Sequence, residues 1–428
     1  MIRIFIAHNQ IYTGPLEYII HLLSKNKSFA YTRTNEKESA QLIFDHTDPS
    51  SVPINVEFYN SLFKDHIYHH EAYFQNAPYI RIPGTSDPDW LASAFYMVNS
   101  FQEYSSESNS ELTDNYGRFR YDKSYQHKFD CIEDNLVQEY FDRFCITHLP
   151  SIQPVTTSKP TRVFLSHDID TVYGSFNQDG MWAIKNGRPD IILKLVMNEL
   201  LRRPHYKNID RIAKLHDEHE LKSTFFWLAT KEVGSNGVKN ADYNISHLED
   251  QLKHSKSNGL HKSSYTTSFD EELKMLPFST SLNRYHFLKF NLPEAWDKLD
   301  AAGLKLDASL GFAPRYGFRN NYGLPFKPYN IATASSYGFV EVPLNVMDGT
   351  LHRYMNIPLK ETANRIIGFI EKNKTNSIIS ILWHNTYFTD YKYAGYLEEY
   401  KKVLLYLLDN GIKSVTPEEL IHEFANDE

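Results

Sequence analysis

Val-Phe-Leu-Ser-His-Asp-Ile-Asp-Thr, residues 163–171, is the stretch that decides the fold. The three apolar residues predict a buried strand, and the polar residues that follow predict its carboxyl end. Asp168 and Asp170 are two positions apart, so their side chains face the same way in extended backbone. Parallel α/β sheets and barrels carry their active sites at this end of their strands. A strand-end loop with a helix cap would explain one aspartate, but the pair favours a functional site.

Short apolar runs and helical patterns alternate through the rest of the C-terminal half. Further strands are predicted at residues 224–227, 304–306, 339–342, 378–383 and 413–415. Helices are predicted at residues 191–201, 209–219, 246–257, 294–302, 359–373 and 396–408, and a last one begins at the capping box Thr416–Glu419. This alternation predicts a parallel sheet, either doubly wound or closed into a barrel.

The length of 428 residues predicts two domains, because one core rarely grows so large. Residues 150–160 hold three prolines and no apolar periodicity, which is typical of a linker. We therefore expect an N-terminal α/β accessory domain at 1–150, a linker at 151–160 and the main domain at 161–428. The accessory domain shows no chemistry of its own. Its expected roles are to cover one end of the main domain, to shape a groove or to mediate assembly.

Composition excludes several classes of function. The formal charge of −8 argues against nucleic acid or an anionic membrane as partner. No apolar run approaches a membrane span, and the N-terminus lacks the pattern of a secretion signal. Two cysteines, Cys131 and Cys145, make no disulfide framework, so we expect a reducing, cytoplasmic location. No phosphate-binding glycine loop and no Gly-x-Ser-x-Gly motif is present.

Three histidines complete the candidate site. His261, His286 and His384 each lie at the end of a separate expected strand, as Asp168 and Asp170 do. Carboxylate oxygen and imidazole nitrogen together suit Zn²⁺, and also Fe, Co, Ni or Mn. The sequence therefore predicts a divalent metal site, most simply for zinc.

Six short motifs occur in one order over about 260 residues. They are Ser166–Asp170, Lys222–Phe226, Gly259–Tyr265, Arg284–His286, Asp307–Ser309 and Leu382–His384. Together they resemble the polysaccharide deacetylase (NodB-homology, carbohydrate esterase) superfamily. The whole chain is most similar to the long bacterial polysaccharide-deacetylase-like proteins that carry an extra N-terminal domain.

The resemblance implies a distorted (β/α) barrel of seven or so strands and a metal-dependent hydrolase that removes acetyl groups from an N-acetylated or O-acetylated sugar or polysaccharide intermediate. It also implies a role for each site residue. Asp168 would be the general base for a metal-bound water, His384 the general acid, and Asp170 and His261 metal ligands. Arg284 would orient Asp168, and Asp307 would support Arg284.

One departure leaves alternatives open. Tyr265 stands where that superfamily has its second metal histidine. We expect His286 to be the third ligand, although a role beside the metal or against the substrate is equally consistent with the sequence. Two alternative functions stay open. The chain could be a non-catalytic carbohydrate-binding or assembly protein with a degenerate barrel, or a hydrolase of another carbon–nitrogen bond such as a cyclic amide.

Overall fold

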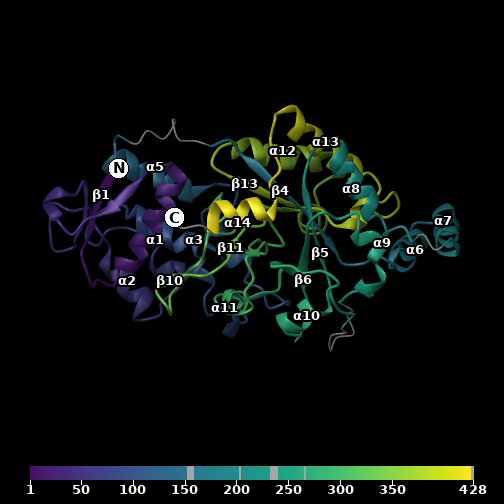
Figure 1. The fold of residues 1–428 in the computed structure, drawn as a ribbon, viewed down its shortest axis with the longest axis horizontal. Helices are drawn as coiled ribbons and strands as arrows, with labels where there is room; N and C mark the ends of the chain where they lie inside the picture. The colour runs from purple at the N-terminus through teal and green to yellow at the C-terminus, as the bar shows by residue number, and fades with distance from the viewer. Residues whose placement is uncertain (152–158, 202–203, 232–239, 265–266, 426–428) are drawn as a thin grey trace.

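The computed structural model describes residues 1–151, 159–201, 204–231, 240–264 and 267–425. The chain is an α/β protein with two separate parallel sheets (Figure 1). The predicted linker falls mainly on residues 152–158, and Tyr265 is also outside the described residues. The domain boundary therefore stays a prediction. Among the described helices, none is both long and apolar enough to cross a membrane.

The N-terminal part is built on a three-stranded parallel sheet in the order β2-β1-β3. Its strands are β1 (Ile2–Ile6), β2 (Tyr31–Arg33) and β3 (Leu42–Phe44), and its helices are α1 (Thr13–Lys27), α2 (Val56–Phe63), α3 (Trp90–Val98), α4 (Tyr125–Lys128) and α5 (Leu136–His148). One apolar core cluster runs from this part into the C-terminal part without a break.

The C-terminal part is built on an eight-stranded sheet in the order β11-β8-β7-β6-β5-β4-β13-β12, with every pair parallel. The strands are β4 (Arg162–Ile169), β5 (Ser223–Trp227), β6 (Asn258–Lys262), β7 (Leu282–Tyr285), β8 (Leu306–Asp307), β11 (Val340–Glu341), β12 (Val346–Met347) and β13 (Ile378–Leu382). The sequence resemblance implied seven or so strands. The sheet has eight, and three of them are only two residues long.

Residues 342–345 show that this sheet is strongly curled. They join β11 to β12, which are the two edge strands. Five peptide steps reach at most about 18 Å, whereas eight strands in a flat sheet would hold their edges about 34 Å apart. The connecting segment also fills the gap: the Leu344 amide donates to the Leu310 carbonyl, and Asn345 exchanges hydrogen bonds with Ser380. This segment thus joins the two edges of the curled sheet, and no pairing of β11 with β12 is present among the described residues.

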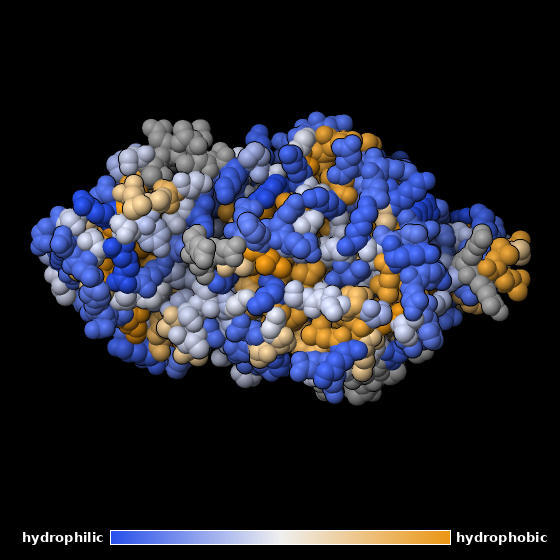
Figure 2. Space-filling model, viewed as in Figure 1, coloured by the Kyte–Doolittle hydropathy of each residue, from blue (hydrophilic) through white to orange (hydrophobic). Residues whose placement is uncertain are grey.

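Helices cover one face of the curled sheet. They are α8 (Ile209–Glu218), α9 (Glu249–Leu252), α10 (Phe269–Met275), α11 (Glu294–Ala301), α12 (Thr362–Lys372), α13 (Tyr396–Asp409) and α14 (Pro417–Ala425). The small hairpin of β9 (Tyr329–Asn330) and β10 (Ser335–Ser336) lies beside α1. At the far end from β1, α6 (Ser175–Lys185) and α7 (Pro189–Leu200) form a hairpin of helices whose exposed apolar residues colour that tip in Figure 2.

Most predicted elements are present, but some differ from the prediction or were missed. The predicted capping box of the last helix is confirmed, since the Thr416 amide donates to Glu419 and the Glu419 amide to Thr416. The helix predicted at 246–257 is wrong: only α9 and a short 3₁₀ turn form, and β6 begins at Asn258. Residues 413–415 make a single bridge to β4 rather than a strand. The helices α6 and α10 and the short strand β12 were not predicted.

Candidate metal centre and active site

The register of the sheet gathers the predicted residues on one face. Register partners point to the same side, and alternate residues along a strand do so too. Asp168 pairs with Phe226, Phe226 with Gly259, and His261 with Arg284. Asp168, His261 and Arg284 therefore share the concave face of the sheet. A Cβ on Gly259 would meet the Phe226 ring at 2.5 Å, so this position needs glycine for the strands to pack.

The His167 side chain points to the opposite, helix-covered face of the sheet. Its Nδ1 lies 2.8 Å from the Trp383 carbonyl, and its Nε2 lies 3.1 Å from Nε2 of His216 on α8. Burial lowers the pKa of His167 to about 4, so the ring is neutral. The histidine in the middle of the Ser166–Asp170 motif is therefore a core residue beneath the helices, not part of the site.

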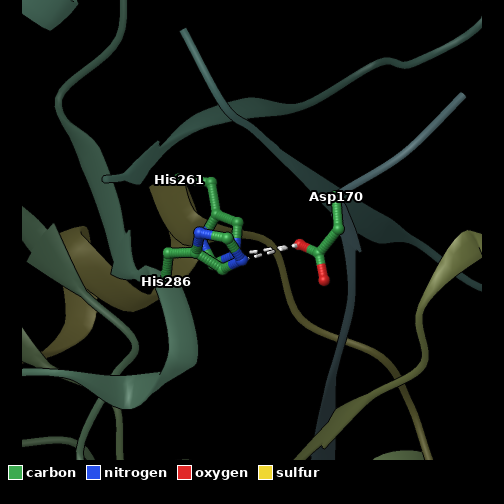
Figure 3. A group of neighbouring side chains, drawn as sticks. All are labelled: Asp170, His261 and His286. Carbon is green, nitrogen blue, oxygen red and sulfur yellow. Dashed lines mark ion pairs between the residues drawn. The ribbon is translucent and has the colours of Figure 1, made fainter. Parts of the chain in front are cut away.

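Asp170, His261 and His286 form a compact group of three possible metal ligands (Figure 3). Asp170 directly follows β4, His261 lies on β6, and His286 directly follows β7. The Asp170 Oδ1 is 3.3 Å from Nε2 of His261 and 3.7 Å from Nε2 of His286. Their ligand atoms all lie within 4.8 Å of one another. His286, the expected third ligand, is thus placed beside the other two.

The bonding around this group fits a divalent cation. The Asp170 Oδ1 is buried and has no hydrogen-bond partner within the described residues. Each histidine fixes its Nδ1 elsewhere: that of His261 lies 3.0 Å from the Arg284 carbonyl, and that of His286 lies 3.1 Å from Oδ1 of Asn240. Both Nε2 atoms are therefore left to face the carboxylate, which is the way ligating histidines are oriented.

The charge states of His286 and Asp170 suit ligation, whereas the pKa of His261 is raised. Burial opposes this rise, but Asp168 and Asp170 outweigh burial, so this ring must release its proton to bind a cation. Burial lowers the pKa of His286 to about 3, despite the attraction of Asp170 and Asp168, so its imidazole is neutral. Burial opposes ionisation of Asp170, but the surrounding imidazoles of His286, His261 and His384 outweigh burial and hold its pKa below the ordinary value. A neutral imidazole and an ionised carboxylate are the forms that bind metals.

Asp168 is buried beside this group and is fixed by Arg284. Its Oδ1 accepts from Nη1 of Arg284 at 3.1 Å, and its Oδ2 is 3.5 Å from Nε2 of His261. Arg284 also donates to Ser166 Oγ and to the Ala308 carbonyl, both at 2.8 Å. Arg284 thus bonds the carboxylate that the resemblance implied it would orient, and Ser166 is a contact that sequence reasoning missed.

Asp307 does not contact Arg284 in the structure. It accepts instead from Asn283 at 2.6 Å and from the hydroxyl of Ser309 at 2.9 Å. The reason lies in the register: Asp307 is the partner of Asn283, so it points to the face opposite that of Arg284. The support that we expected from Asp307 comes from the neighbouring Ala308 carbonyl.

His384 closes the site from β13. Its Nε2 is 3.7 Å from Oδ2 of Asp170, and its Nδ1 is 2.7 Å from Oδ1 of Asp348, just beyond β12. Burial alone would lower the pKa of His384, but Asp348, Asp170 and Asp168 raise it to about 10. Sequence reasoning did not connect Asp348 with His384, because no spacing links residues 348 and 384.

A cavity of about 480 Å³ opens at the site, and its lining includes Asp168, Asp170, His261, His286, Asp348 and His384. Its wall also includes Phe287, Tyr354 and Tyr387, together with the amides of Asn177, Gln178 and Asn240. Aromatic faces beside a few amide groups are suited to a sugar-sized polar ligand. Arg319 is not among the residues that line this cavity: it is buried and forms a two-bond ion pair with Glu103.

Comparisons with known proteins bear on the two parts separately. The family of unknown function DUF7033 matches residues 4–148. No curated protein matches the chain. Structurally similar chains include proteins described as polysaccharide deacetylases.

One, from Mycobacterium smegmatis, is 11% identical, with 62% of this chain and 90% of that one covered and a TM-score of 0.40. One from Bordetella bronchiseptica, described as involved in O-antigen biosynthesis, is 14% identical, with 66% and 90% covered and a TM-score of 0.30. The Bdellovibrio bacteriovorus peptidoglycan deacetylase is 12% identical, with 63% and 57% covered and a TM-score of 0.30. These values are low, and the assignment of the site rests on its own geometry.

Proposed function

We propose that the chain is a metal-dependent hydrolase that removes an acetyl group from an N-acetylated or O-acetylated sugar or polysaccharide intermediate. The observation that carries this proposal is the convergence of Asp170, His261 and His286 beside Asp168 and His384. A divalent cation held by those three ligands, zinc by the preference of imidazole, would polarise an acyl carbonyl and acidify water.

Asp168 is the proposed general base. Its carboxylate is buried, opens onto the cavity and is fixed through Oδ1 by Arg284, which leaves Oδ2 directed toward His261. A carboxylate held in this way can accept a proton from the attacking water without turning away.

His384 is the proposed general acid. Its raised pKa keeps the ring protonated at neutral pH, and Asp348 fixes its Nδ1, so that Nε2 is the atom that faces the cavity. From there it can donate a proton to the leaving amine or alcohol of the sugar. A base and an acid that act on the attacking and leaving groups are what acyl-group hydrolysis requires.

The test measures acetate release and metal content of the full chain supplied with Zn²⁺, Co²⁺ or Mn²⁺. Substrates are N-acetylglucosamine oligomers and O-acetylated glycans. We expect Asp168→Asn to retain the metal but lose at least about 100-fold in rate, and Asp170→Ala to lose both. Asp217→Asn, an exposed carboxylate paired with Lys256, is the matched control and should resemble wild type.

Two outcomes contradict the proposal. If the wild-type chain binds metal but releases ammonia or opens a cyclic amide instead of releasing acetate, the reaction is another carbon–nitrogen hydrolysis. If it binds glycans with no metal and no turnover, it is a carbohydrate-binding protein.

A further inference from the structure

The loop that carries His286 has a strained backbone. Phe287 and Leu288 both adopt left-handed conformations, with φ of 60° and 52°, although neither is glycine. Two such residues in succession persist only when their surroundings fix them. The Phe287 ring stacks on the His286 ring, with 3.7 Å between centroids and 18° between planes. The position of this candidate ligand is therefore coupled to the loop.

A turn in the N-terminal part, Asp114–Arg118, packs against this loop. Nη1 of Arg118 donates to the Phe287 carbonyl at 2.8 Å. The Tyr116 ring packs on the Phe287 ring, with centroids 5.8 Å apart, and the Asn291 amide donates to the Gly117 carbonyl at 2.8 Å. Three contacts thus join the turn to the segment that begins at His286.

Contacts within the turn hold its shape independently of the loop. The Asp114 carboxylate accepts from the amides of Tyr116 and Arg118, and Gly117 has a φ of 78°, which favours glycine. The Arg118 guanidinium is held by Asp114, with Nη2 2.6 Å from Oδ2, and lies 4.7 Å over the Tyr116 ring. Arg118 is only 7% exposed, yet it lines the same cavity as Asp168 and His384.

We propose that Arg118 and its turn are positioning elements for His286, so that the N-terminal part of the chain completes the metal centre of the C-terminal part. This inference rests on the proposed function for the identity of the site, and it gives the N-terminal part a defined role. Arg118 acts through the Phe287 carbonyl and does not itself touch the reacting atoms.

The experiment compares Arg118→Ala, Arg118→Lys and Arg120→Ala in the full chain. Arg120 is two residues away in the same segment and forms an exposed pair with Asp122, so it is the matched control. Co²⁺ titration followed by visible absorption gives the metal Kd without any substrate. We expect Arg118→Ala to weaken Co²⁺ binding about tenfold and to change the ligand-field bands, Arg118→Lys to restore part of the affinity, and Arg120→Ala to match wild type.

A double-mutant cycle with His286→Ala separates positioning from general destabilisation. If Arg118 acts through His286, then Arg118→Ala should add little to the affinity loss of His286→Ala. Additive losses, or a Kd for Arg118→Ala equal to that of Arg120→Ala, would overturn the inference.

Hydrogen exchange of the metal-free chain tests the positioning role of Arg118 without measuring catalysis. Amides of residues 286–291 should exchange faster in Arg118→Ala than in Arg120→Ala, with the rest of the chain unchanged. Equal exchange in both variants would count against the inference. A wild-type chain that shows these effects but releases no acetate would contradict the proposed function and leave the role of Arg118 supported.

Discussion

His384 and Asp348 are bound through two contacts, although 36 residues separate them in the chain. Nδ1 of His384 lies 2.7 Å from Oδ1 of Asp348, and the His384 amide donates to Oδ2 at 2.5 Å. One carboxylate thus fixes both the backbone and the ring of the proposed acid. Such a partner sets the tautomer of the ring and stabilises its protonated form.

Asp348→Asn should therefore change the pH dependence of the reaction as well as its rate. Asp348 raises the pKa of His384, so its removal lowers that pKa. Because the proposed acid works when protonated, the alkaline limb of the kcat/KM profile should move to lower pH, and the rate at pH 8 should fall at least about 100-fold. Asp297→Asn, at a carboxylate that bonds Tyr337 and does not line the cavity, serves as control. An unmoved alkaline limb would show that His384 is not the group that limits activity at high pH.

Gly259→Ala should damage the centre through packing alone. The added Cβ would approach the Phe226 ring to 2.5 Å and Leu282 Cβ to 3.1 Å, so the strands β5, β6 and β7 must shift. Overpacking of this kind lowers the free energy of unfolding by about 1–3 kcal/mol. Urea unfolding and the Kd for Co²⁺ measure the two effects. Phe226→Leu should recover part of both. Gly368→Ala, on the open surface of α12, should leave the Kd unchanged and raise the free energy of unfolding by about 0.5–1 kcal/mol, because alanine favours a helix more than glycine does.

Glu103→Ala should be among the most destabilising single changes. Glu103 and Arg319 are both 2% exposed in their side chains, and the Arg319 guanidinium lies between the rings of Phe290 and Phe312. Removal of one partner leaves a buried charge without compensation, which lowers the free energy of unfolding by about 3–5 kcal/mol. Asp122→Ala, which breaks an exposed pair, should lower it by at most about 1 kcal/mol. Urea unfolding of both variants measures the two decreases in the free energy of unfolding. Equal decreases would mean that the buried pair is not structurally important.

Glu341→Gln should flatten the pH dependence of stability. Burial raises the pKa of Glu341 well above its ordinary value, and the neighbouring Asp307 carboxyl raises it further, while burial raises the pKa of Asp307 to about 6. Between about pH 4 and pH 6 the folded chain then holds more protons than the unfolded chain, so the contribution of this pair to stability declines as pH rises.

The readout is the wild-type free energy of unfolding minus that of Glu341→Gln, measured from pH 4 to pH 8. This difference should fall as pH rises, since carboxylates other than Glu341 and its coupled neighbour Asp307 cancel in the subtraction. A constant difference would contradict a protonated Glu341 in the folded chain. Trp296, whose indole donates to Glu341 at 3.1 Å, provides a fluorescence signal close to the pair.

The sequence by itself determined the local features of this protein. The apolar run 163–165 and the following Asp168 and Asp170 predicted a strand end, because alternation along extended backbone depends only on neighbouring residues. The same reasoning placed most helices, and the Thr416 capping box, close to where they lie. It failed at 246–257, where only the short α9 and a 3₁₀ turn form before β6 begins at Asn258.

Only the tertiary structure decided which strand ends meet and which face each side chain joins. The curl of the eight strands brings His261, His286 and Asp170 together, and the register turns Asp307 away from Arg284. The contacts of His384 with Asp348 and of Phe287 with Arg118 join residues 36 and 169 positions apart. No local spacing encodes such contacts, because they follow from strand order and packing of the whole chain.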